Sequence, residues 1–415
     1  MKAKEVFTPG SLPSVTFVSD HITDKQRSLI NGLEMGAVVI TISGPSKSGK
    51  TVFVEKQVGK DNLLHVTGAG VDHPNVLWNR IFDLIGTPSE KIEAKEILSR
   101  SSATGNVSGE FGIILKGKAE VSVESESGKK ESVSSKKIFD PLQSLIKELG
   151  KTGYVVFLDD FHYITQEAQR EIAEQIKEAI RNEVKIVCAS VPYHTDDVIR
   201  ANPDLRGRTV NIDLDFWDEP TLCKIGSKGF SELGISADAT FISRLAKEAA
   251  GSPQLMQALC LQSCFHIDIL ESTSNHVTLP NNDELFYSIC TKTSSMVDYS
   301  SIINKLREGP KTRGESRKQF TLHDGSQADV YPILLKALAI DPPQLTFRYP
   351  NLNTRIQSLC VNETPSGSSI IGACYQIAKI ANDSSKEPIL EWDTDGDVFD
   401  IRDPYLLFFM RWGDK

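Results

Sequence analysis

The sequence predicts an α/β protein with a parallel sheet at its core, and two observations support that prediction. Uninterrupted runs of β-branched and apolar residues, typical of strands buried on both faces, lie at 37–43, 154–158 and 184–190. Between the last two runs, residues 166–181 have the spacing of an amphipathic helix. A further strand is expected at 209–214. Strands that alternate with helices in this way favour parallel pairing with helical crossovers.

A glycine-rich segment, GPSKSGKT, follows the first of these strands directly. It matches the pattern G-x-x-x-x-G-K-[ST], and the residues after it can continue as a helix that stops at Gly59. In such a strand–loop–helix arrangement the backbone N–H groups point at phosphates, Lys50 reaches the β- and γ-phosphates, and the Thr51 hydroxyl binds Mg²⁺. The predicted phosphate-binding residues are Gly44, Pro45, Ser46, Lys47, Ser48, Gly49, Lys50 and Thr51.

Two carboxylates, Asp159 and Asp160, end the second apolar run. We expect Asp159 to hold Mg²⁺ together with Thr51, and Asp160 to orient or deprotonate the attacking water. Many fast ATPases carry glutamate at the second position. Because aspartate is one methylene shorter, the sequence predicts slow turnover, as in a switch.

Three further polar residues are candidates for catalysis. Ser190 ends the third run, where a polar side chain can contact the γ-phosphate. Arg206 and Arg208 precede the fourth strand, the region from which ring-forming ATPases present an arginine to a neighbour's nucleotide. Arg208 is slightly favoured of the two, and a surface salt bridge is an equal alternative for each.

A small helical lid is expected over 219–300. The tripeptide Gly251–Pro253 interrupts its helical pattern, because glycine frees the backbone and proline blocks helix continuation. This favours a fixed turn opposite the nucleotide, with Pro253 as a contact. A plain helix–helix turn is the alternative.

These motifs together resemble the AAA+-like ATPases of the STAND and origin-recognition-initiator type. The resemblance rests on GPSKSGKT, the strand that ends at Asp159–Asp160, the segment DLRGR, and GSP in the lid, and it covers residues 36 to about 265. It implies ATP and Mg²⁺ as cofactors and a homo-oligomer joined through an arginine finger. It also implies an adenine contact from the N-terminal segment 1–35, where Val18 is the candidate. Such ATPases often work beside a separate effector in bacterial stress or phage defence.

The last part of the chain, 330–415, reads as three helices followed by a hairpin around Asp395–Gly396, an order that resembles a winged helix-turn-helix domain. The third helix, Ser369–Asn382, would be the recognition helix. Its single cation, Lys379, equips it poorly to read a major groove, so protein contact is favoured over sequence-specific DNA binding.

Two other segments have an ambiguous pattern. The basic stretch 301–329 could grip phosphates of DNA or RNA through Arg313, Arg317 and Lys318, or could be a solvated linker. The insert 100–137 alternates like an exposed hairpin that could meet a partner through Lys116 and Lys118, or could be a plain surface excursion.

Composition narrows the functional classes. A net charge of −9 argues against coating nucleic acid through bulk charge. Seven cysteines without a CxxC pair indicate a reducing cytoplasm, and no stretch has the length of a membrane helix. Our main hypothesis is an ATP-switched oligomeric ATPase that recruits a partner effector. The alternatives are an initiator-type DNA-binding loader or transcriptional regulator and, less favoured, a small-molecule kinase.

Overall fold

The computed structural model describes residues 1–86, 140–191, 198, 201–274, 277–311, 314, 316–383, 388–394 and 396–413. The insert 100–137, with Lys116 and Lys118, lies outside these residues, as do Arg313 and Asp395. The chain forms two compact units. We call Gln26–Ser43 with Val54–Ile212 the sheet unit, and we call Met1–Lys25, Gly44–Phe53 and Asp213–Lys415 together the helical unit. The domain boundaries expected from the sequence stay a prediction.

The sheet unit is built on five strands in the order β2-β3-β4-β1-β5. Their bounds are β1 Val39–Ser43, β2 Leu63–Thr67, β3 Val155–Asp159, β4 Lys185–Ser190 and β5 Thr209–Asp213. The pairs β1–β4, β3–β4 and β2–β3 are parallel. Every residue of β1 and β3 is buried, as expected for central strands covered on both faces. The predicted α/β fold with a parallel sheet is confirmed.

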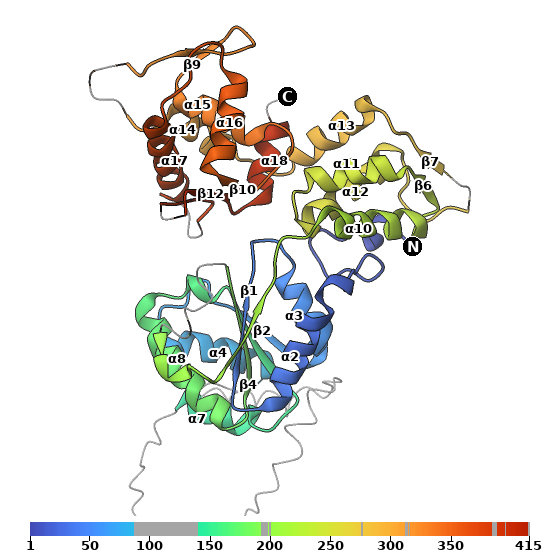
Figure 1. Ribbon diagram of the computed structural model, residues 1–415. Coiled ribbons are helices and arrows are strands. Elements are labelled where there is room, and N and C mark those ends of the chain that lie inside the picture. Colours follow the sequence, from blue (N-terminus) through green and yellow to red (C-terminus); the bar gives the residue numbers. More distant parts are fainter. Residues whose placement is uncertain are drawn as a thin grey trace, which may run out of the picture. The chain divides into compact units, whose positions relative to one another are not determined.

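Helices cover both faces of this sheet. Helices α4 (Pro74–Ile85) and α8 (Gln166–Arg181) lie on one face, and α2 (Thr23–Met35) lies on the other (Figure 1). In α8, Ala168, Ile172, Ile176 and Ile180 recur every four residues and are all buried, so one apolar stripe packs on the strands. Helix α7 (Pro141–Leu149) begins at the side chain of Asp140, which accepts hydrogen bonds from two backbone N–H groups.

Within the helical unit, we use the name lid for the portion that overlaps the expected segment 219–300. Its helices are α10 (Glu219–Glu232), α11 (Ala239–Glu248), α12 (Pro253–His266) and α13 (Asp283–Ser294), with the short parallel pair β6 (Ile235–Ala237) and β7 (Val277–Leu279). The N-terminal helix α1 (Ala3–Val6) contributes Ala3, Val6 and the following Phe7 to the lid's hydrophobic core.

The part of the helical unit that follows α13, which we call the C-terminal region, has a separate hydrophobic core. Its helices are α14 (Ser300–Glu308), α15 (Val330–Ala339), α16 (Tyr349–Leu359) and α17 (Gly367–Asn382), and its short strands are β8 (Phe320–Thr321) and β9 (Gln327–Ala328). A three-stranded sheet in the order β10-β12-β11 completes it, from Thr346–Arg348, Val398–Ile401 and Leu390–Asp393. The predicted third helix and hairpin are present, which is compatible with a winged helix.

The last helix, α18 (Pro404–Trp412), belongs to both cores of the helical unit. Leu406 and Leu407 pack in the core of the C-terminal region, whereas Phe408 and Trp412 pack in that of the lid. A helix that is apolar around most of its circumference is buried on several sides. Helix α18 therefore joins the lid to the C-terminal region.

Candidate nucleotide-binding site

The glycine-rich loop runs directly from β1 into α3 (Lys50–Val58), the order that the motif requires. At Gly44, an added Cβ would lie 2.7 Å from the backbone oxygen of Leu214, so only glycine fits there. The Lys50 ammonium donates to the backbone oxygens of Gly44 and Pro45, at 2.8 and 3.0 Å. The loop backbone thus wraps around the Lys50 side chain and holds its ammonium group by two hydrogen bonds.

Ser48 provides a test of whether the loop fits a phosphate. Its side chain is 3% exposed, and its hydroxyl has no hydrogen-bond partner. A buried hydroxyl without a partner costs free energy, about 1–3 kcal/mol, unless another group completes it. The indole N–H of Trp217 donates to the backbone oxygen of Ser48, at 3.2 Å, and holds the loop on one side. A buried hydroxyl that needs a partner, in a loop of this pattern, suits a phosphate oxygen.

In the sheet unit, the carboxyl ends of β3 and β4 meet at one edge. Asp159 and Ser190, at those ends, are both buried. Ser190 lies in register with Ser43, the last residue before the loop. Strand order and chain connectivity therefore put Asp159, Ser190 and the start of the loop on the same sheet edge, where parallel α/β sheets bind ligands.

Asp160 has a left-handed backbone, with φ at 56°. Its N–H donates to Oδ1 of Asp159, at 3.0 Å, so the two acidic residues are fixed relative to each other. Aspartate and asparagine adopt this conformation more readily than most residues. The roles expected from the sequence, Mg²⁺ ligand for Asp159 and water-orienting residue for Asp160, stay a prediction.

His65, which the sequence reasoning missed, contacts this acidic pair. It lies on β2, and its Nε2 is 3.1 Å from Oδ2 of Asp159. Strand β2 was not predicted, because the polar His65 interrupts its apolar run. As one of the two edge strands it is only half buried, and His65 occupies one of its exposed positions. The alternating pattern of residues 63–67 is the signal that could have identified it.

Arg206 and Arg208 lie away from this edge. The backbone oxygen of Arg208 accepts from the N–H of Val39, at 2.9 Å, and Val39 is the first residue of β1. Both arginines therefore precede β5 at the opposite end of the strands. Within one chain the two arginines therefore lie at the other end of the sheet from Asp159 and Ser190. A catalytic role for either arginine would require that it act on the nucleotide of a neighbouring chain.

The candidate adenine contact Val18 and the candidate nucleotide contact Pro253 both belong to the lid. Val18 is fully buried in the lid core, and Pro253 is the first residue of α12. The predicted turn at Gly251–Pro253 is present between α11 and α12. Gly251 has φ at 85°, and an added Cβ would lie 2.7 Å from Phe216. The turn is therefore fixed, while the contacts of Val18 and Pro253 with a nucleotide stay a prediction.

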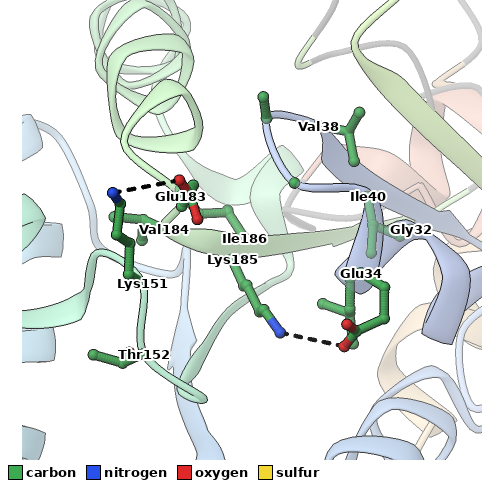
Figure 2. A pocket seen from close by; sticks show the side chains of 13 residues that line it. Gly32, Glu34, Val38, Ile40, Lys151, Thr152, Glu183, Val184, Lys185 and Ile186 are labelled. Carbon is green, nitrogen blue, oxygen red and sulfur yellow. Dashed lines mark ion pairs between the residues drawn. The ribbon is translucent and has the colours of Figure 1, made fainter.

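A pocket of about 260 Å³ lies at the other end of the sheet, where β1 and β4 begin. Ion pairs line it, Lys151 with Glu183 at 3.8 Å and Lys185 with Glu34 at 3.6 Å (Figure 2). Its lysines already face carboxylates, and none of its described lining residues belongs to the loop Gly44–Thr51. It is therefore distinct from the edge that carries Asp159 and Ser190.

In the basic stretch, Arg317 has an internal structural role. It donates to the backbone oxygen of Glu308 and to Asp329, at 2.7 and 2.9 Å, and its guanidinium lies 4.5 Å from the centre of the Tyr331 ring. Lys318 pairs with Glu363 at 2.8 Å and keeps 65% of its side chain exposed. Of these two predicted phosphate contacts, Lys318 is the accessible one.

Comparisons with known proteins bear on the fold. No family model matches the chain, and no curated protein matches it. Among solved structures, the Walker-type ATPase PABY2304 of Pyrococcus abyssi is 13% identical, with a TM-score of 0.50 over 94% of this chain and 95% of that one. The ORC2 protein of Aeropyrum pernix, in ADPNP–ADP complexes, is 11% identical, with a TM-score of 0.51 over 98% and 96%. At such identity the likeness shows the fold, which is that of P-loop ATPases.

Proposed function

We propose that the protein binds ATP with Mg²⁺ at the loop Gly44–Thr51 and hydrolyses it slowly. The observation that carries this proposal is the loop itself. It follows a fully buried central strand, it encloses Lys50, and it holds the buried Ser48 hydroxyl without a partner. In a P-loop ATPase fold, this combination is suited to a nucleotide's phosphates.

In the proposed mechanism each residue has one task. The loop amides and Lys50 bind and orient the phosphates, and Thr51 and Asp159 would hold Mg²⁺, which neutralises charge on the phosphates when bound. Asp160 takes up the proton of the attacking water or orients it, and Ser190 contacts the γ-phosphate. Because Asp160 is shorter than glutamate, we expect slow turnover.

Calorimetric titration with ATP and Mg²⁺, paired with a phosphate-release assay, tests this function. We expect Lys50→Ala to abolish binding, because it removes the charge that the loop encloses. The exposed Lys60, just beyond α3, gives the matched control, Lys60→Ala, which should bind as wild type does. Asp160→Asn should bind ATP and lose hydrolysis, since asparagine tolerates the left-handed backbone. Equal binding by Lys50→Ala and wild type would exclude this site.

We further propose that ATP drives self-association, with Arg208 or Arg206 of one chain reaching a neighbour's nucleotide. This is supported by the position of both residues before β5, at the strand ends opposite to Asp159. Light scattering of Asp160→Asn with ATP and Mg²⁺ should report a rise in mass that Arg208→Ala and Arg206→Ala reduce. A constant monomer mass under every nucleotide condition would count against a ring. Recruitment of a separate effector, as in phage defence, rests on the resemblance alone.

A second candidate function is nucleic-acid binding by the C-terminal region as an initiator-type protein, and a groove there favours it. The groove measures about 730 Å³ and is lined by Lys318 and by Ser366, Ser368 and Ser369 at the start of α17. Serine hydroxyls, helix N–H groups and a lysine suit backbone phosphates better than base edges. Binding to random-sequence duplex DNA should weaken with salt and weaken further in Lys318→Glu. Binding that is independent of salt would exclude this mode.

A further inference from the structure

We propose that Lys47 and Asp403 form a nucleotide-sensitive clasp between the phosphate loop and helix α18. The inference rests on the proposed function, because it assigns a regulatory contact to the same loop. Lys47 occupies one of the variable positions of the motif, where the phosphate-binding chemistry demands no particular side chain.

The clasp is a closely coordinated ion pair. The Lys47 ammonium donates to both carboxylate oxygens of Asp403, at 2.7 and 2.8 Å, and lies 4.5 Å from the centre of the Tyr405 ring. The Tyr299 hydroxyl donates to the same carboxylate. The side chains of Lys47 and Asp403 are only 28% and 17% exposed. Partial burial and a shared network make such a pair stronger than an exposed salt bridge.

Asp403 also begins helix α18, since its side chain accepts from the N–H of Tyr405 at 3.0 Å. One carboxylate therefore both caps the helix that joins the two cores and holds a side chain of the loop. At Lys47 the backbone is left-handed, with φ at 63°, a conformation that a non-glycine residue adopts only when its surroundings hold it. The loop conformation and the start of α18 are thus coupled through the Lys47 side chain, which pairs with Asp403 and lies over the Tyr405 ring.

A bound triphosphate would act on this pair electrostatically. Its negative charge attracts the Lys47 ammonium and repels the Asp403 carboxylate. Both interactions are Coulombic and act over a few ångströms. Nucleotide binding should therefore loosen the clasp and free the first turn of α18. By reciprocity, the closed clasp must oppose nucleotide binding to the same extent. Asp403 thus acts as an autoinhibitory residue, and α18 transmits occupancy of the loop to the C-terminal region.

Asp403→Asn isolates the charge from the helix cap, since asparagine caps helices as well as aspartate does. We expect this variant to bind ATP about fivefold more tightly or better, within the usual range of coupling between sites. Lys47→Gln leaves the Asp403 charge beside the loop and should bind more weakly, and adding Asp403→Asn to it should recover affinity. Asp298→Asn is the matched control. It removes one exposed carboxylate that caps Ser300 in the same unit, and it should bind as wild type does.

The direct readout is amide hydrogen exchange over residues 404–412, with and without saturating ATP and Mg²⁺. In wild type we expect ATP to speed exchange there, and in Asp403→Asn we expect fast exchange already without ATP. The clasp is refuted if wild type binds ATP with no change in exchange at α18, or if Asp403→Asn and wild type bind with equal affinity; in either case the proposed ATP site stands. If wild type binds no ATP, the proposed function and the clasp fail together.

Discussion

At the scale of single residues, one buried carboxylate joins the lid to the C-terminal region. Glu248 is the last residue of α11 and is 6% exposed. Its carboxylate accepts hydrogen bonds from Nε and Nη2 of Arg411, at 2.9 and 2.7 Å. It also accepts a hydrogen bond from the indole N–H of Trp412, at 2.7 Å. Arg411 also donates to Asp341, at 2.7 Å. Removing Glu248 would leave Arg411 with the largely exposed carboxylate of Asp341, so the buried guanidinium would lose most of its charge compensation. Glu248→Ala should therefore lower the free energy of unfolding by about 3 kcal/mol, measured by urea denaturation.

Glu232 provides the control at this scale, because it is an exposed glutamate at the end of a neighbouring lid helix. Glu232→Ala should change the free energy of unfolding by no more than about 0.5 kcal/mol. The double variant Glu248→Leu with Arg411→Met should recover much of the lost stability, since apolar groups can replace a buried ion pair. If the double variant loses as much free energy of unfolding as the two single variants lose together, the pair does more than compensate charge.

At the scale of elements, the turn between α11 and α12 and the middle of α17 predict opposite effects of the same substitution. Gly251→Ala places a Cβ 2.7 Å from Phe216 on a backbone with φ at 85°, so it should cost about 1–3 kcal/mol. Gly372 lies inside α17, with nothing within 4 Å of an added Cβ. Gly372→Ala should stabilise by about 0.5–1 kcal/mol, because alanine forms helix better than glycine. Thermal unfolding of both variants measures the difference, and a like sign for both would contradict it.

The sequence predicted the elements whose signal is local. Strands β1, β3 and β4 are apolar enough to identify, and α8 and the hairpin β11–β12 follow from periodicity and turn chemistry. Strand β2 escaped because an edge strand needs to be apolar on only part of its surface. The contacts of Lys47 with Asp403, separated by 356 residues, depend on the fold as a whole, and no spacing rule reports them.

The site divides in the same way. The phosphate loop and Asp159–Asp160 are contiguous motifs and could be named in advance, whereas the His65–Asp159 contact is set by pairing between strands 94 residues apart. The internal role of Arg317 was also hidden, because a run of cations has the same pattern whether its members face solvent or brace a domain. Within the described residues, none of the helices combines the length and apolar character needed to cross a membrane.

At the scale of the whole molecule, cysteines mark three hydrophobic cores. Cys188 is buried in the hydrophobic core of the sheet unit. Three cysteines, among them Cys264, are buried in the lid core, and two, among them Cys374, are buried in the core of the C-terminal region. Burial raises the pKa of Cys264 and that of Cys374 to about 12, so thiolate is scarce at either residue at neutral pH. Cys223 is the cysteine with a partly exposed side chain. Pulsed alkylation of the native protein should therefore label Cys223 first, and Cys223→Ser should abolish that early product.

Increasing urea then reports how the cores unfold. Because α18 contributes apolar residues to both the lid core and the C-terminal core, and Arg411 binds Glu248 between them, we expect Cys264 and Cys374 to become reactive at a shared urea midpoint. Cys188 belongs to the other compact unit and should have a midpoint of its own. Glu248→Ala should split the shared midpoint in two, since it removes the buried pair while leaving each core intact. Separate urea midpoints for Cys264 and Cys374 in wild type would mean that α18 does not unite the lid and the C-terminal region in a single cooperative unit. The clasp at the first turn of α18 would then have no rigid element through which to act.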